Sequence, residues 1–270
     1  MNNQLRFKFP PVKRVIQTIW FEQLETLRTL DLADIRTKWF DEFPVLEEVP
    51  PLPAWANVST NFALVGSDGR WPMPACVFAS VQRDRQVLVQ QDRLHLGWRF
   101  DPDTSSDYPG FATLSQSLSR YFEDFTYSIR KASNPRPNVE RVEIVYVNQL
   151  VGIDAEDVGR AILVDETIAP TISGRQADSI IVSKHFCGTD ENMDVTLQVS
   201  VREGPSDVND DEHAHSSRGS QLEIVGFADV EPEMSYEVRL DDVHSAILHR
   251  FLLLVGDDLR NSWGEYHGQG

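Results

Sequence analysis

The chain has 270 residues, and 42 Asp and Glu against 25 Lys and Arg give it a formal charge of −17 at neutral pH. Apolar residues make up 41% of the chain and aromatic residues 10%, close to globular averages, which excludes disorder of the whole chain. Only two cysteines occur, Cys76 and Cys187, so a disulfide framework is excluded as well. Both are expected to be reduced, buried thiols of a cytoplasmic protein.

No segment of the sequence has the pattern of a membrane or secretion signal. The first 15 residues lack the apolar stretch of a signal peptide, and no apolar run approaches the roughly 18 residues of a membrane span. The longest apolar run, residues 246–255, is interrupted by His249 and Arg250. We therefore expect a cytoplasmic protein that does not bind membranes.

Negative charge is concentrated in the second half of the chain. Residues 1–135 hold 15 basic and 16 acidic side chains, whereas residues 136–270 hold 10 and 26, so the halves carry −1 and −16. Such a field repels nucleic-acid phosphates and anionic lipids and attracts basic proteins. We expect a basic protein partner and no direct nucleic-acid contact. The alternative is that the charge serves solubility alone.

In the first half, hydrophobic periodicity and turn residues predict strands and two helices. Residues 10–21 begin with two prolines and read as a strand, Leu24–Phe43 as a helix that Pro44 ends, and 45–55 as an extended connection. The further predicted strands, of which the last three form an antiparallel meander, are Asn61–Val65, Ala75–Val81, Val87–Gln90 and Leu94–Phe100. The clearest helical periodicity follows at Phe111–Ala132.

The second half repeats this order of elements. A strand is predicted at Val139–Leu150, and then a short helix at Asp154–Ile162 with Asp154 as its N-cap. The predicted strands that follow are Ser179–Cys187, Met193–Glu203 and Gln221–Val230. A helix at Leu240–Trp263, with Asp241 as its N-cap, ends the pattern.

Two short motifs recur between the halves. Pro10-x-Val12-x-Arg14-Val15 returns as Pro137-x-Val139-x-Arg141-Val142, and Leu118-x-Arg120-Tyr121 returns as Leu248-x-Arg250-Phe251, at offsets of 127 and 130 residues. Near-equal offsets indicate an internal repeat. We predict an α+β fold of antiparallel sheet with long helices on one face. It would consist of two tandem β-α-β-β-β-α units, residues 1–135 and 136–270, or of one continuous domain.

Several segments together resemble a sporadically distributed, uncharacterised prokaryotic protein family. They are PPVKRVIQTIWF, VLVQQDRLHLGWRF, YPGFATLSQSLSRYFEDF, VERVEIVYVNQL and LDDVHSAILHRFLLLVGDDLRNSW. Members of that family begin with a Pro-rich strand and end on a Leu-Asp-x-x-His helix, here Leu240 to His244. The resemblance covers nearly the whole chain and implies a fold. It implies no activity or catalytic residues, and the family's scattered occurrence points to defence or toxin–antitoxin loci.

One acidic stretch has the residue types of a metal site. Carboxylates with a His-x-His pattern suit Zn²⁺ or Mn²⁺, but no apolar residues flank the stretch to fix its geometry, so we expect a solvated hairpin tip, no metal and no cofactor. The residues are Asp207, Asp210, Asp211, Glu212, His213 and His215.

Other polar groups favour structural roles. Asp241 and His244 share a helix face without a nucleophile, which indicates a cap and a packed helix–sheet contact. His185 and Cys187 share a strand face and are expected to be buried. The recurring arginines, expected to pair internally with carboxylates, are Arg14, Arg141, Arg120 and Arg250.

These patterns favour a non-enzymatic interaction protein, such as an antitoxin, immunity protein or regulatory subunit. Its expected contacts are Trp55 and Trp71 as aromatic anchors, together with the carboxylates at 207, 210, 211 and 212. The alternative is a chaperone-like module that binds a peptide or small ligand in an apolar groove. A third hypothesis is a metal-dependent hydrolase built on residues 207–215.

Overall fold

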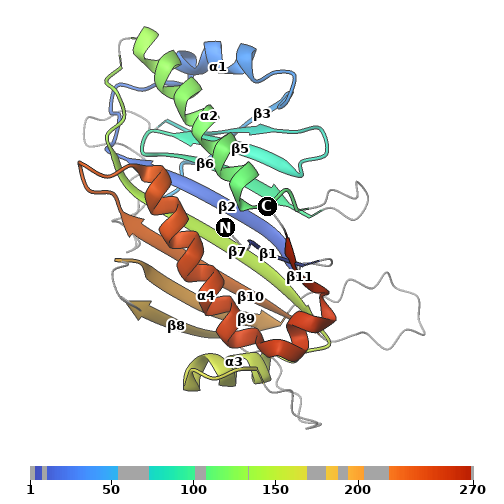
Figure 1. Cartoon of the computed structure of the whole chain (residues 1–270). Coiled ribbons are helices and arrows are strands. Elements are labelled where there is room, and N and C mark those ends of the chain that lie inside the picture. Colours follow the sequence, from blue (N-terminus) through green and yellow to red (C-terminus); the bar gives the residue numbers. More distant parts are fainter. Residues whose placement is uncertain are drawn as a thin grey trace. The chain divides into compact units, whose positions relative to one another are not determined.

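The computed structural model in Figure 1 is an α+β protein. It describes residues 4–7, 11–53, 73–100, 108–132, 134–168, 181–187, 194–203 and 219–268. Within these ranges, no helix combines the length and the apolar character needed to cross a membrane.

The strands within the described residues form two sheets. A nine-stranded antiparallel sheet has the order β3-β4-β5-β6-β2-β7-β10-β9-β8. Its strands are β2 (Val12–Phe21), β3 (Val45–Val49), β4 (Ala75–Ala79), β5 (Arg85–Gln90), β6 (Arg93–Arg99), β7 (Val139–Val151), β8 (Ile181–Cys187), β9 (Thr196–Glu203) and β10 (Gly219–Asp229). A separate antiparallel pair joins β1 (Gln4–Phe7) to β11 (Glu265–Gly268).

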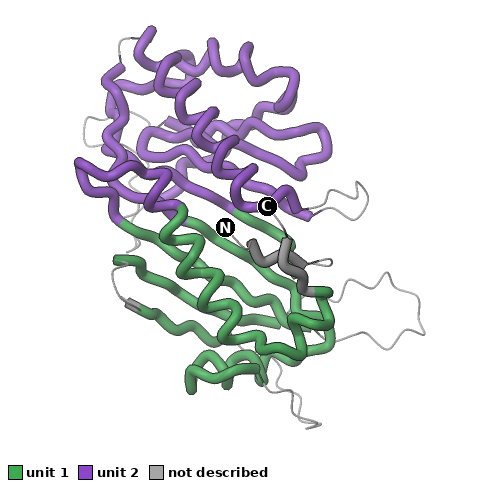
Figure 2. The backbone as a smooth tube through the Cα atoms, in the orientation of Figure 1, with its two compact units in different colours: residues 1–15, 144–228, 241–270 green, residues 16–143, 229–240 purple. Residues whose placement is uncertain are grey.

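The chain divides into two compact units (Figure 2). Unit 1 comprises residues 1–15, 144–228 and 241–270, and unit 2 comprises residues 16–143 and 229–240. Each unit therefore draws on segments that are distant in the sequence.

The core of unit 2 forms beneath α2 (Phe111–Lys131), which confirms the helix predicted there. Its buried stripe packs on β2, where the ring of Phe21 stacks on Phe125 at 5.5 Å between centroids. A second aromatic group joins α2 to the preceding segment, because Trp39 meets both Phe78 and Tyr121 edge-on at 5.2 Å. Burial of these rings contributes to the stability of unit 2.

The prediction of a long helix at Leu24–Phe43 is wrong in its extent, because the helical part is shorter. A 3-10 turn at Thr29–Leu32 leads into α1, which covers only Ala33–Lys38. The backbone before them makes its hydrogen bonds elsewhere, since the N–H of Glu22 donates to Asn138 O and the N–H of Leu24 donates to Gln91 O. These donors are satisfied by neighbouring chain segments, so the helical pattern is overridden.

Three other predictions for the first half differ in how they compare with the structure. The connection predicted at 45–55 contains a strand, β3, which pairs with β4 from Val45 opposite Ala79 to Val49 opposite Ala75. The strand predicted at Asn61–Val65 lies outside the described residues. The meander prediction is confirmed, since β4, β5 and β6 pair in succession.

In the second half of the chain, the predicted strands are present as β7 to β10, and α3 (Ala155–Val164) follows Asp154 at its N-cap position. The Asp154 side chain makes no capping hydrogen bond, and its backbone carbonyl instead accepts from the N–H of Asp157. The last helix, α4 (Tyr236–Ser262), begins before Asp241. The N-cap prediction for Asp241 is therefore wrong, because the Ser235 hydroxyl accepts the N–H of Val238 and caps the helix.

The close approach of α4 to β10 depends on Gly226. A Cβ at this position would lie 2.8 Å from Cγ1 of Val243 and 2.9 Å from Cδ1 of Ile247. Replacing Gly226 with Ala should lower the free energy of unfolding by about 1–3 kcal/mol, as overpacking usually does. Urea unfolding measures this. Gly97→Ala is the control, because the three atoms nearest to its Cβ all belong to the flexible Gln86 side chain, and an equal loss in both variants would contradict the packing argument.

Candidate interaction surface

The described part of the chain contains an exposed acidic segment where β10 leads into α4. Glu231, Glu233 and Glu237 are exposed there, in residues 229–240 of unit 2. None of the ion pairs among described residues includes these three glutamates. Their combined charge of −3 therefore faces solvent without a described counter-ion.

Apolar side chains lie among these carboxylates. Met234 is 37% exposed and Val238 is 51% exposed, so both present apolar surface to a partner. We call the five residues Glu231, Glu233, Met234, Glu237 and Val238 the acidic ledge. A surface that combines charge with apolar anchors suits protein association better than charge alone, because apolar contacts supply affinity while charge steers encounter.

The acidic ledge is held in place by contacts on both sides of it. Tyr236 meets the ring of Phe122 on α2 edge-on at 5.5 Å, and burial raises the pKa of its phenol. At the other side, Arg141 on β7 makes an ion pair with Asp229 at 2.5 Å, and Nε of Arg239 donates to the carbonyl of Asp229 at 2.9 Å. These contacts fix the backbone that carries the glutamates.

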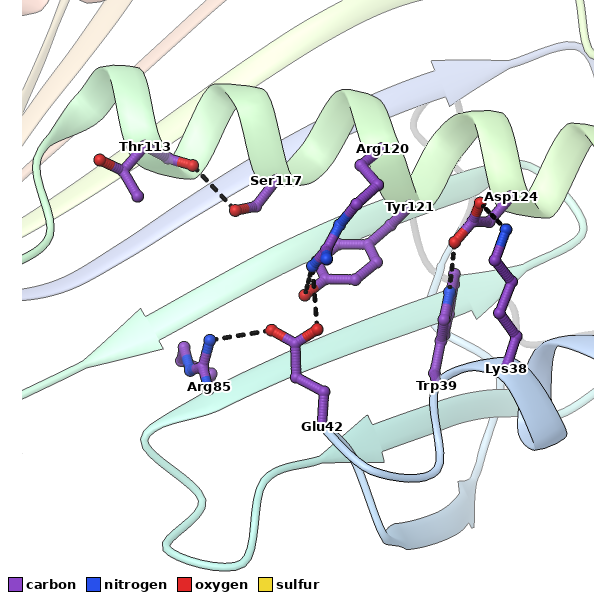
Figure 3. Close-up of polar contacts among 9 residues, drawn as sticks. All are labelled: Lys38, Trp39, Glu42, Arg85, Thr113, Ser117, Arg120, Tyr121 and Asp124. Carbon is purple, nitrogen blue, oxygen red and sulfur yellow. Dashed lines mark hydrogen bonds and ion pairs between the residues drawn. The ribbon is translucent and has the colours of Figure 1, made fainter.

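Figure 3 shows a second charged cluster, centred on Glu42. Its carboxylate accepts from Nη1 of Arg85 and from Nη2 of Arg120, both at 2.9 Å. Nη2 of Arg120 also donates to the hydroxyl oxygen of Tyr121 at 2.6 Å. Burial, and then the hydrogen bond to Glu42, raise the pKa of Tyr121. Each of these four side chains has a partner within the cluster, which joins α2 to the strands rather than providing a reactive group.

The same row of contacts continues along α2 (Figure 3). The carboxylate of Asp124 accepts from Nζ of Lys38 at 2.5 Å and from the indole Nε1 of Trp39 at 2.9 Å. Lys38 is the last residue of α1 and Trp39 follows it. The contacts therefore attach the end of α1 to the long helix of unit 2, which is a structural role.

His244 lies where α4 packs on the sheet of unit 1, as predicted. Its Nδ1 is 3.1 Å from the hydroxyl of Tyr146 on β7. Burial lowers the pKa of His244 to about 4, so the imidazole is neutral at neutral pH. Asp241, one turn earlier, is exposed, and Ser245 is also exposed. This arrangement is a packed helix–sheet contact and not a nucleophile with its base.

The prediction that the recurring arginines pair internally is confirmed for three of the four. Arg120 pairs with Glu42, Arg141 with Asp229 and Arg250 with Asp165. Arg14, by contrast, is exposed.

The prediction that Cys76 is buried is confirmed. Burial raises the pKa of its thiol to about 11, which makes it unreactive at neutral pH.

The prediction that His185 is buried is wrong. His185 is exposed on β8, opposite Gln198 of β9. Because side chains alternate along a strand, Phe186 faces α4 and its neighbour His185 faces the other way. The side chain of Cys187 lies outside the described residues.

The remaining predicted site residues also lie outside the described ranges. They are Trp55, Trp71, Asp207, Asp210, Asp211, Glu212, His213 and His215. In the part of the chain that is described, no group of His, Cys, Asp or Glu side chains has the arrangement of a metal site.

Sequence reasoning missed two features. The acidic ledge carries a local signal, since the stretch Glu-Pro-Glu-Met-Ser-Tyr-Glu combines acids with apolar residues just before a helix. The other is Arg93, whose guanidinium lies 3.9 Å above the ring of Trp20 although only 5% of the residue is exposed. Burial of this arginine has no local sequence signal, because Trp20 and Pro53, which cover it together with the adjacent Asp92, come from distant segments.

In comparisons with known proteins, the chain matches no protein-family model and no curated protein. The resemblance to the sporadic prokaryotic family therefore stays a prediction.

Proposed function

We propose that this chain is a non-enzymatic interaction protein that binds a basic protein partner, as an antitoxin, immunity protein or regulatory subunit of a prokaryotic defence-type locus does. The observation that carries the proposal is the charge of −16 in residues 136–270, part of which is exposed on the acidic ledge without a described counter-ion. The charged clusters at Glu42 and Asp124, by contrast, join elements of the fold.

The proposed mechanism divides the work between charge and apolar contact. The acidic field accelerates encounter with a basic partner, and Met234 and Val238 supply contact area once the surfaces meet. The contacts of Tyr236 and Asp229 hold the acidic ledge in one conformation, which limits the entropy lost on binding. The carboxylates at 207–212 add to the same field by their charge.

A capture experiment with matched charge variants tests the proposal. Tagged protein is used to recover partners from lysate of its own host, and each recovered protein is quantified by mass spectrometry. The ledge variant carries Glu231→Gln, Glu233→Gln and Glu237→Gln. The control variant carries Glu22→Gln, Glu25→Gln and Glu48→Gln, which removes three exposed charges from the first half.

We expect the wild type to recover one basic protein in near-stoichiometric amount, the control variant to recover about as much, and the ledge variant to recover at least about fivefold less. The expected loss corresponds to about 1 kcal/mol or more for three charges at an interface. Equal recovery by both variants would remove the acidic ledge from the proposal. Recovery of no basic protein by the wild type would contradict the function itself.

We also propose that the fold consists of two tandem β-α-β-β-β-α repeats, the first ending and the second beginning near residue 135. These repeats follow the two halves of the sequence and have other bounds than units 1 and 2. The strand order supports this proposal, because the first strand of each half neighbours the last meander strand of that half: β2 lies beside β6, and β7 beside β10. The first half has one strand more, β3, at its outer edge.

The recurring arginines support the same proposal. Arg120 on α2 pairs with Glu42, four residues after the end of α1. Arg250 on α4 pairs with Asp165, which directly follows α3. In both halves, an arginine of the long helix thus reaches the end of the short helix, as a duplicated unit would require.

Helix contacts in unit 1 support the expectation that the helices cover one sheet face. Gly226 of β10 approaches α4, and Leu222 lies on the same face of that strand four residues earlier. Leu222 is opposite Val201 of β9, which lies beside Gly159 of α3. Directly opposite residues of antiparallel strands share a face, so α3 and α4 lie on the same side.

A further inference from the structure

Three apolar side chains of unit 1 are exposed where the chain leaves α3 and meets α4. Leu163 and Val164, in the last turn of α3, are 60% and 55% exposed, and Leu253 of α4 is 50% exposed. The hydroxyl of Thr167 donates to the carbonyl of Leu253 at 3.0 Å, so the chain after α3 runs beside α4 at this point. We call Leu163, Val164 and Leu253 the α3–α4 patch. Apolar side chains that gather on a surface mark interaction sites more often than scattered ones do.

Two further contacts fix the position of the α3–α4 patch. Asp165, which ends α3 in a left-handed backbone conformation, forms an ion pair with Arg250 of α4. Further along the chain, the N–H of Ile168 donates to the carbonyl of Leu254 at 2.7 Å. The patch is therefore ordered before a partner binds, which limits the entropy lost on association.

The ion pairs beside the patch present their negative members to solvent. Arg250 is buried, whereas its partner Asp165 is exposed. Arg260 is half-buried, whereas its partner Asp257 is exposed, and both follow Leu253 within α4. A partner that approaches this surface therefore meets carboxylates before it meets guanidinium groups.

Two more carboxylates add to the negative charge. Glu166 follows α3 and Asp258 belongs to the last turns of α4, and both are exposed. None of the ion pairs among the described residues includes either of them. Lys184 opposes this charge, since its Nζ donates to the carbonyl of Leu163 at 3.2 Å. Four carboxylates against two arginines and one lysine leave a charge of −1 around the patch, within a protein whose net charge is −17.

We propose that the α3–α4 patch binds a basic amphipathic helix of a partner protein. The apolar stripe of such a helix covers the patch, and the lysines or arginines along the stripe meet the surrounding carboxylates. An acidic helix would be repelled by the same carboxylates, and a purely apolar one would leave them without counter-ions. The patch belongs to unit 1 and the acidic ledge to unit 2, so this inference goes beyond the proposed function and does not rest on it.

Fluorescence anisotropy with a labelled synthetic helix tests the proposal at about 150 mM NaCl, where long-range attraction between charges is screened. The probe is a peptide of leucine and lysine with its leucines at helical spacing, and a scrambled peptide of the same composition has no apolar face. The patch variant carries Leu163→Ser and Leu253→Ser. The control variant carries Leu30→Ser and Val81→Ser, which removes two exposed apolar side chains from unit 2. Urea unfolding first establishes that each variant is folded.

We expect saturable binding of one probe helix per chain, unchanged in the control variant and at least about tenfold weaker in the patch variant. Tenfold corresponds to about 1.4 kcal/mol, which loss of the buried area of two leucines accounts for. A second variant, Glu166→Gln with Asp258→Asn, keeps the patch and should bind the probe at least about threefold more weakly.

Three results would overturn the proposal. The first is absence of saturable binding by the wild type, and the second is equal binding by wild type and patch variant. The third is equally tight binding of the scrambled peptide, which would show that charge alone attracts the probe. None of these results bears on the capture of a basic protein by the acidic ledge, so the two proposals fail separately.

Discussion

Between pH 7 and pH 4, the wild-type protein should lose about 3 kcal/mol more of its free energy of unfolding than a His244→Gln variant. Burial lowers the pKa of His244 from 6.5 to about 4 in the folded protein. Between these two values the unfolded chain binds a proton that the folded chain does not, so stability falls as the pH falls. A shift of about 2.5 pKa units corresponds to roughly 3 kcal/mol.

Urea unfolding at several pH values between 7 and 4 measures the effect. Glutamine retains a polar group near the hydroxyl of Tyr146 but does not titrate in this range. The difference between wild type and variant in the pH dependence of the unfolding free energy is therefore due to His244. His249→Gln is the matched control, because His249 lies on the same helix and is exposed. Parallel pH profiles of wild type and His244→Gln would show that the imidazole is accessible to protons in the folded protein.

Replacing Arg93 with Met should lower the free energy of unfolding of the protein by about 3 kcal/mol. Only 5% of Arg93 is exposed, and its Nη2 donates to the carbonyl of Pro53 at 2.5 Å and to the carboxylate of Asp92 at 2.8 Å. Methionine keeps apolar contact with the Trp20 ring but leaves both acceptors without this donor. Removing one partner of a largely buried charged pair costs about 3–5 kcal/mol, and partial exposure of Asp92 places the effect at the low end.

Arg99→Met is the control for this variant, since Arg99 is an exposed residue on the same strand. We expect it to change the free energy of unfolding by less than about 0.5 kcal/mol. We expect the two variants to differ because Arg93 helps to hold the chain segment before residue 54. Gln90 holds the same segment through two hydrogen bonds to the backbone of Leu52. An equal loss of unfolding free energy in Arg93→Met and Arg99→Met would contradict the claim that the buried contacts of Arg93 stabilise the protein.

Arg93 also affects the pKa of a nearby carboxyl group. Burial raises the pKa of Glu143 on β7, and the positive charges of Arg93 and Arg141 oppose that rise. Arg93 therefore partly offsets the effect of burial on the pKa of the half-buried Glu143 carboxylate, in addition to fixing the chain near Leu52.

The elements with strong periodicity were predictable from the sequence. The stripe from Leu114 to Ile129 repeats at helical spacing and is buried as α2, and the alternation in β10 is reproduced as a buried and a half-exposed face. The internal pairing of Arg120, Arg141 and Arg250 was also predictable, because an arginine on an apolar element must find a carboxylate.

Where the predictions failed, distant contacts override local pattern. Residues 24–28 have helical spacing, but backbone hydrogen bonds to Gln91 and Asn138 hold the preceding chain in another conformation. Ser235 rather than Asp241 caps α4, because the helix begins at Tyr236, which packs on Phe122. Exposure of His185 depends on which face of β8 meets the helices, and a single strand does not encode that choice.

The acidic ledge needed the structure for its recognition. In the sequence, its three glutamates are part of a half that contains 26 acids, and the mixture of acids and apolar residues around them does not show which charges stay exposed. The fold distinguishes them, because it pairs Asp229 with Arg141 and leaves Glu231, Glu233 and Glu237 exposed beside Met234. The proposed function thus depends on which charges remain exposed after folding, and not on the total.

The most direct test of that function is the salt dependence of the association rate constant for the basic partner recovered by capture. Stopped-flow or biosensor kinetics between about 20 and 150 mM NaCl would measure it for wild type and for the variant with Glu231, Glu233 and Glu237 changed to Gln. Electrostatic steering predicts at least an approximately tenfold fall for the wild type over this range and a shallower fall for the variant. A rate constant that does not change with salt would contradict the account, and the acidic half would then serve solubility alone.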